Sequence, residues 1–231
     1  ILFTGYALQT AGLHRTTVAK AGFLTGIYIP LVPLFGSLVY RIRPRLVELA
    51  GIALATLGTF LMTMPDAQAL DNLNLLASLN PGDLLVIAAT AAWGLQIIVL
   101  GHYSNHHSAP VLAVGQIGTC ALLGAASFWW AEPVRAVWSR EALFGIVFAA
   151  ALATALAFAF QSWAQRFVPP NRAALLFATE PLFAWAAAYA LTRESLSGRA
   201  IFGALLILAS VLLVEMKPAA IAGHPSGQTN T

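Results

Sequence analysis

The sequence predicts an all-α integral membrane protein, a polytopic helical bundle, on three observations. Of its 231 residues, 59% are hydrophobic and only 9% are charged, whereas about a quarter of the residues of a soluble domain are charged. The mean hydropathy is +0.77. Long uncharged stretches also follow one another along the chain, and a helix needs roughly 20 apolar residues to cross a bilayer core about 30 Å thick. So few charges cannot cover the surface of a soluble domain, so that class is excluded.

The uncharged stretches predict one partial and seven complete membrane-spanning helices. The partial helix is 1–13, which is too short to span alone. The complete helices are 21–40, 49–65, 84–101, 109–131, 142–165, 173–192 and 200–214. The last is short, but Arg199, Glu215 and Lys217 at its ends can extend to the interface. The polar residues 217–231 predict a disordered tail.

An internal repeat is indicated when the sequence is shifted by 152 residues, since 1–62 then aligns with 153–214 without a gap. Similar residues share equivalent positions: Gln9 and Gln161, Lys20 and Arg172, Arg41 and Arg193, Gly51 and Gly203. We expect five helices per repeat, with the first copy in 1–65 lacking its first two helices, an inter-repeat loop at 66–82 and the second copy in 83–216. About eight helices of ten are then present. An odd number of helices inverts the second copy, as is typical of secondary transporters.

The charges and the few reactive side chains exclude other classes of protein. A net charge of +3 comes from 12 Lys and Arg against 9 Asp and Glu, spread without a basic stripe, so no nucleic-acid partner is expected. Cys120 is the single cysteine, so no intrachain disulfide can form. The histidines at 102, 106 and 107 are too few for a metal centre, and no phosphate loop or nucleophile motif is present. We therefore expect no metal, no cofactor and no enzyme.

Several segments resemble EamA-type transporters of the drug/metabolite transporter superfamily. In the second half they are Ala92-Trp93-Gly94, 152–157 leading to Gln161, 172–183 with Thr179-Glu180-Pro181, Arg193-Glu194-Ser195-Leu196, and 203–208. In the first half they are Gln9-Thr10, Lys20-Ala21-Gly22-Phe23, Pro33-Leu34-Phe35 and Gly51-Ile52. The resemblance implies two inverted five-helix repeats that export or import small metabolites. This chain departs from it by lacking two helices, and by having the basic turn 41–45 where a Gly-Glu-Arg-like turn is expected.

Glu180 is the only acidic residue well inside an uncharged stretch, and an ionisable group at membrane depth is a functional hypothesis by default. In a helix that begins near Arg172, a rise of about 1.5 Å per residue puts Glu180 about 12 Å deep, close to the midplane. It could bind a proton, a cationic group or a hydrogen-bond donor. Alternatively, it stabilises backbone freed by Pro181 or bonds a neighbouring helix. The repeat makes Tyr28 its equivalent, with ordinary packing as the alternative role.

Glutamines recur on four of the predicted helices, at 9, 96, 116 and 161. Amides inside a bilayer need partners, so they face other helices or a wet cavity. Trp93 precedes Gln96 by three residues and can line the same cavity. Helix-to-helix bonding is the alternative role of each amide. The predicted substrate site consists of Glu180, Gln161, Gln9, Tyr28, Trp93, Gln96 and Gln116.

These residues and the resemblance together predict a secondary transporter in the bacterial inner membrane. This permease moves small amino-acid-like or drug-like metabolites by alternating access, with efflux as the favoured direction. Its partners are the lipid bilayer and a small-molecule substrate. Proton coupling through Glu180, and a homodimer through Gly22 and Gly26, are further hypotheses. The alternatives are a non-transporting membrane scaffold and an intramembrane lipid-modifying enzyme.

Overall fold

The computed structural model describes residues 1–41, 43–63, 79–131, 138–192 and 197–216, and all regular structure in these ranges is helical. The segments are α1 (Leu2–Leu13), α2 (Val18–Thr25), α3 (Tyr28–Tyr40), α4 (Leu46–Thr63), α5 (Pro81–Tyr103), α6 (Ala109–Ala131), α7 (Arg140–Phe148), the π-helix η3 (Ala149–Leu156), α8 (Ala157–Ala164), α9 (Pro170–Phe177), α10 (Glu180–Thr192) and α11 (Gly198–Glu215). The predicted tail at 217–231, and 66–78 of the predicted inter-repeat loop, lie outside the described residues.

Six described helices are long and apolar enough to cross a membrane. They are Lys20–Tyr40 (α2 with α3), Leu46–Thr63, Pro81–Tyr103, Ala109–Phe128, Arg140–Ala164 (α7 to α8) and Gly198–Glu215. The helix predicted over 173–192 is instead divided into α9 and α10, and α1 has only 12 residues. A helical membrane protein is thus confirmed, whereas eight spanning helices stay a prediction.

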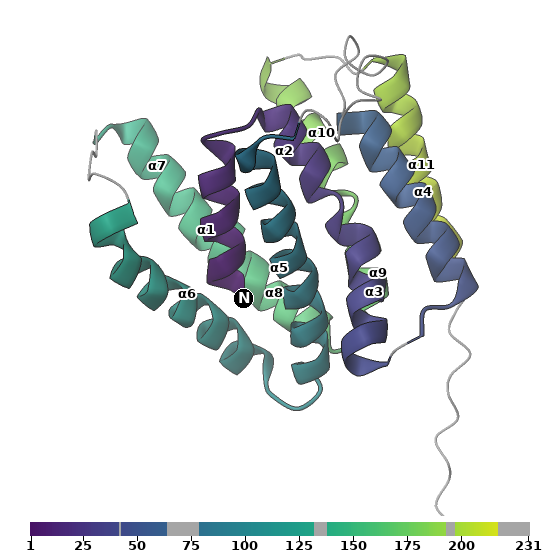
Figure 1. Cartoon of the computed structure of the whole chain (residues 1–231), viewed down its shortest axis with the longest axis horizontal. Coiled ribbons are helices and arrows are strands. Elements are labelled where there is room, and N and C mark those ends of the chain that lie inside the picture. Colours follow the sequence, from purple (N-terminus) through teal and green to yellow (C-terminus); the bar gives the residue numbers. More distant parts are fainter. Residues whose placement is uncertain (42, 64–78, 132–137, 193–196, 217–231) are drawn as a thin grey trace, which may run out of the picture.

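Helix α5 lies at the centre of the bundle (Figure 1). Of its spanning window, 56% is buried, against 6% for that of α6, because α5 packs against α1, α2, α3 and α9. The core beside it contains Ile29, Val32, Ile98, Leu175 and Ile207. Helices α6 and α7 lie on one side of α5, and α4 and α11 on the other.

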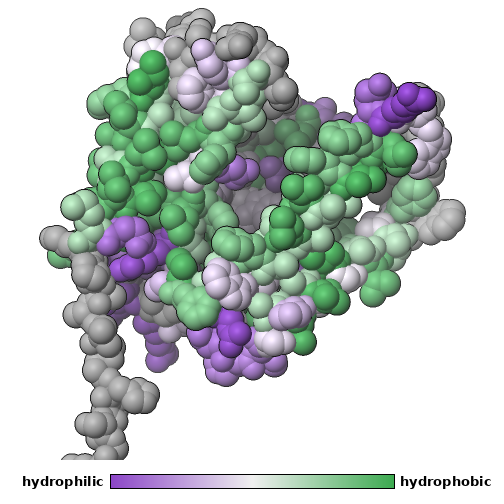
Figure 2. Space-filling view, turned by 180° about the vertical axis from the view of Figure 1, so that it is seen from behind, coloured by the Kyte–Doolittle hydropathy of each residue, from purple (hydrophilic) through white to green (hydrophobic). Residues whose placement is uncertain are grey.

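The outer faces of the bundle are apolar. Leu122 of α6 is 74% exposed and Phe144 of α7 is 71% exposed. Figure 2 shows hydrophobic residues over most of one face, with hydrophilic residues gathered toward its two ends. A large exposed apolar surface with polar ends suits a helical bundle surrounded by lipid chains.

Two of the predicted helices are broken near their middles. The break after α2 is at Gly26 and Ile27, and the break after α9 is at Ala178 and Thr179. Proline has no N–H, so Pro181 cannot bond the carbonyl of Phe177 four residues earlier. Pro30 likewise cannot bond the carbonyl of Gly26, which accepts instead from the Ile29 N–H at 3.2 Å.

These breaks correct two expectations from the sequence. A single helix from Arg172 past Glu180 was wrong, since Glu180 is the first residue of α10. The helix expected over 21–40 is likewise interrupted, so Tyr28 is the first residue of α3, while Pro33 is accommodated inside that helix. Both candidate residues therefore lie at helix breaks.

The helix bounds follow the 152-residue shift. Adding 152 to the bounds of α2, α3 and α4 gives the bounds of α9, α10 and α11 in every case. The breaks after α2 and α9 therefore also fall at equivalent positions, although Gly26 is matched by Ala178. The repeated pattern of charged residues thus coincides with a repeated pattern of helices.

Helix α4 packs along α11 through small residues. A Cβ added to Gly58 would lie 2.6 Å from the carbonyl oxygen of Gly203, and one added to Gly203 would lie 2.6 Å from that of Gly58. Seven residues earlier on α4, a Cβ on Gly51 would lie 3.3 Å from the carbonyl oxygen of Ser210. Positions 51 and 58 are the equivalents of 203 and 210, so the two contacts are counterparts and the helices run antiparallel.

Gly22 and Gly26, the two glycines proposed for a helix contact, differ in their surroundings. A Cβ on Gly26 would lie 2.8 Å from Cγ2 of Thr59, so Gly26 packs tightly on α4. The space around Gly22 is open to 4 Å. Packing within the bundle therefore involves only the second glycine, and the homodimer stays a prediction.

The close α4–α11 contact predicts that Gly58→Ala destabilises the protein by about 1–3 kcal/mol, because a methyl group there forces the two backbones apart. The measurement is thermal unfolding in detergent. Gly115→Ala in α6 is the matched control, since nothing lies within 4 Å of a Cβ there. Alanine is the better helix former, so the control should be neutral or slightly stabilised. Equal melting temperatures for the two variants would contradict the contact.

Candidate substrate site

A cavity of about 360 Å³ lies between α1, α3, α5, η3, α8 and the α9–α10 break. Six of the seven residues predicted for the substrate site line it: Gln9, Tyr28, Trp93, Gln96, Gln161 and Glu180. The seventh, Gln116, does not reach this cavity. It lines a separate cavity between α1, α5 and α6, where Gln96 is also present.

The glutamines form one hydrogen-bonded group. Gln161 Nε2 donates to Gln96 Oε1 at 3.2 Å, and Gln96 Nε2 donates to Gln116 Oε1 at 3.0 Å and lies 3.4 Å from Gln161 Oε1. Gln116 Nε2 in turn donates to Ser162 Oγ at 3.2 Å. The amides thus join α5, α6 and α8, as the helix-bonding alternative requires. Gln96 and Gln161 also line the cavity, so their predicted contact with a substrate stays a prediction beside this helix bonding.

Gln9 and Trp93 join the first helix to the central one. Trp93 Nε1 donates to Gln9 Oε1 at 2.9 Å. Tyr6, on the Gln9 face of α1, packs edge-on to Trp93 with ring centroids 4.8 Å apart. Its ring is 6.5 Å from that of Phe158 on α8. These contacts fix the indole, because both its N–H and its ring have partners.

The cavity wall contains aromatic residues that the sequence did not single out. Phe158 and Phe177 line it together with Tyr6, Tyr28 and Trp93. An apolar aromatic residue within an apolar helix carries no signal of its own. For Phe158 the available signal was spacing, since it lies three residues before Gln161 on α8 and so shares its side of the helix. Phe177 lies three residues before Glu180, but the helix break separates the two, so spacing gives no such signal there.

Glu180 gives the cavity its charge. Its side chain is exposed to the cavity space, and among the described residues its carboxylate has no hydrogen-bond or ion-pair partner. No lysine, arginine or histidine belongs to the described lining. A lone carboxylate beside π-faces attracts cations, through its charge and through the ring quadrupoles.

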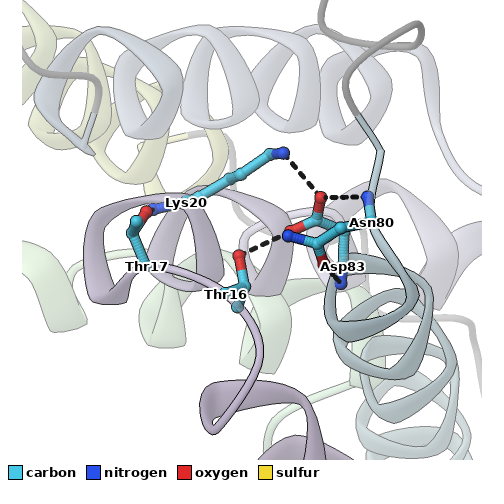
Figure 3. A network of polar contacts seen from close by, with 5 residues as sticks. All are labelled: Thr16, Thr17, Lys20, Asn80 and Asp83. Atoms are coloured by element: carbon cyan, nitrogen blue, oxygen red, sulfur yellow. Dashed lines mark hydrogen bonds and ion pairs between the residues drawn. The ribbon is translucent and has the colours of Figure 1, made fainter.

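A polar network ties one end of α2 to the start of α5 (Figure 3). Asp83 accepts from Thr16 Oγ1 at 2.5 Å and pairs with Lys20 Nζ at 2.5 Å. Asn80 and Asp83 also form a capping box, with Asn80 Oδ1 and Asp83 N 2.9 Å apart. The Asp83 side chain is fully buried, so its charge depends on these partners.

Comparisons with known proteins agree with the resemblance of the sequence to EamA-type transporters. A transporter from Archaeoglobus fulgidus, described as uncharacterized, is 29% identical over 215 residues, which is 93% of this chain. This chain spans 66% of that relative's length. A protein of known crystal structure has the same fold over 93% of this chain and 73% of its own, with a TM-score of 0.77 and 17% identity. The family model for EamA-like transporters matches residues 80–216, more than half of the chain, and the chain belongs to this family.

Proposed function

We propose that the protein is a secondary transporter of small amphipathic metabolites that carry an amine, whether amino-acid-like or drug-like. The proposal rests on the composition of the cavity lining. It combines one unpartnered carboxylate, aromatic walls and an amide pair, with no cationic side chain in the described lining. Such a lining offers an ion pair or cation–π contact to an ammonium group and apolar surface to the rest of the molecule.

Alternating access is the proposed mechanism, and two features of the fold support it. The helix bounds repeat at a shift of 152 residues, and the antiparallel contact between α4 and α11 consists of equivalent positions. An inverted pair of repeats accounts for both. The cavity lies where α1 and α3 of one proposed repeat face α5 and α8 of the other, the usual place for a substrate in such proteins. Rocking of one half against the other would open the cavity to each side of the inner membrane in turn, with export as the proposed net direction.

A panel of ligands that share one ring skeleton tests the proposal. Phenethylamine, phenylalanine, hydrocinnamate and phenethyl alcohol differ in charge but little in size. We expect phenethylamine to raise the unfolding temperature of the detergent-solubilised protein most, and hydrocinnamate least, because only a ligand that binds the folded state stabilises it. Flux of the stabilising ligand is then measured in both directions in proteoliposomes.

The panel also separates the alternatives. A scaffold would gain no stability from any of the four ligands. A lipid-modifying enzyme would convert a labelled phospholipid without moving the amine. If phenethylamine bound but no flux were measured in either direction, the cavity would be a binding site and the proposed transport function would be contradicted.

A further inference from the structure

A second cavity, of about 400 Å³, reaches Glu180 from another side. It shares Gln9, Thr25, Tyr28, Phe177 and Glu180 with the first cavity, but its remaining lining differs. There the walls are mostly threonines and small residues of α2, α4 and α10 in place of the tryptophan and amide pair. The carboxylate of Glu180 therefore stands at the junction of an aromatic cavity and a second, mostly apolar cavity whose walls include three threonines.

The carbonyl ends of two half-helices meet at this second cavity. Helix α2 ends at Thr25 and α9 ends at Phe177, and both residues line it. The half-helices run toward their breaks from opposite ends of the bundle (Figure 1). A helix carries roughly half a negative charge at its C-terminus, so two such ends add to the carboxylate.

The breaks leave backbone oxygens without donors. Among the described residues, no backbone N–H bonds the carbonyl oxygens of Thr25, Phe177 and Ala178. Ala178 is only 2% exposed, and buried carbonyl groups are usually paired. These oxygens are free to accept from a donor or to coordinate a cation.

Thr59 supplies an independent observation. Its side chain on α4 is 4% exposed, lines the second cavity, and its Oγ1 has no hydrogen-bond partner among the described residues. Other threonines of the membrane helices, such as Thr56 and Thr63, bond a carbonyl one turn earlier in the same helix. A buried hydroxyl left unsatisfied costs free energy unless something outside the chain binds it.

We propose that the second cavity binds a sodium ion beside Glu180. The carboxylate, the carbonyl ends of α2 and α9, and the Thr59 hydroxyl are hard oxygen ligands, which suit alkali cations and not softer metals. One carboxylate matches a single positive charge. Carbonyls of interrupted helices are a recurrent way to hold coupling ions at the middle of a membrane. The proposal rests on the proposed transport function: sodium and the ammonium group would bind Glu180 in turn, and this exchange would let the sodium gradient drive export.

Sodium titration without any organic ligand tests the site. The unfolding temperature of the purified protein is followed as NaCl replaces CsCl at constant ionic strength and pH, so that no ammonium ion competes for Glu180. We expect a saturable rise with sodium in the unaltered protein and no rise for Glu180→Gln. Thr59→Val keeps the shape of the side chain and removes one oxygen, so sodium should bind about tenfold more weakly. Thr56→Val is the matched control, because Thr56 lies on the same helix and lines neither of the two cavities.

Each outcome decides the proposal. A sodium response weakened by Thr59→Val and unchanged by Thr56→Val supports it. A response equal in all variants is a general salt effect and overturns it, as does no response in the unaltered protein. Because the titration contains no amine ligand, either of these results would contradict the sodium site only. The proposed transport function would still be tested separately by the ligand panel. If sodium bound but none of the four phenyl ligands stabilised the protein, the ion site would be supported and the proposed amine substrate would be contradicted.

Discussion

Replacement of Glu180 by glutamine is expected to weaken phenethylamine binding about 100-fold, since losing one member of a desolvated charge pair costs roughly 2–5 kcal/mol. Glutamine keeps the size and one oxygen of the side chain but carries no charge and accepts no proton at physiological pH. The same variant should therefore lose any acceleration of amine flux by a pH gradient. The measurements are thermal stabilisation by the amine and flux into proteoliposomes with and without the gradient.

Glu141→Gln provides the control for this substitution. Glu141 lies in the first turn of α7, is exposed and lines none of the described cavities around Glu180. Its replacement should leave amine binding and flux unchanged. If Glu180→Gln bound the amine as tightly as the unaltered protein does, the cavity would recognise its ligand through aromatic rings and amides alone. If pH-driven flux persisted, proton coupling would have to involve another group.

The polar part of the candidate site could be predicted from the sequence because the bilayer makes polar residues conspicuous. A glutamine or glutamate within an apolar helix must face other helices or water. Gln9, Gln96, Gln161 and Glu180 accordingly line one cavity, although each comes from a different part of the chain. The 152-residue shift added Tyr28, which has no local signal beyond its hydroxyl.

The helix breaks could not be predicted as clearly. Pro30 and Pro181 are visible in the sequence, but many membrane helices tolerate a proline, so its presence does not tell a kink from a break. The breaks make Tyr28 and Glu180 the first residues of α3 and α10 and free the carbonyls on which the proposed ion site depends. The burial of the Thr59 hydroxyl without a partner is likewise a tertiary fact, since it depends on how neighbouring helices cover that side chain.

The Asp83 network shows the same division between local and distant signals. Asn80 and Asp83 have the spacing of a capping box, which is a local pattern at the start of α5. Thr16 and Lys20, however, lie more than sixty residues earlier in the chain and reach Asp83 only through the fold. A sequence pattern identifies the helix start, whereas the ion pair that holds α2 to it needs three-dimensional packing.

Asp83→Asn is expected to destabilise the protein by about 2 kcal/mol, because it removes the charge of a fully buried carboxylate that pairs with the partly exposed Lys20. The free energy of unfolding is measured by titration with a denaturing detergent. Asn80→Ala is the comparison, since it removes the cap acceptor and leaves the ion pair, and such a loss costs about 1 kcal/mol. Lys20→Met combined with Asp83→Asn should recover part of the loss, because the neutral methionine side chain packs beside the neutral amide without an ionic partner. Equal destabilisation by Asp83→Asn and Asn80→Ala would mean that Asp83 acts only as a helix cap, and that α2 is held to α5 by apolar packing.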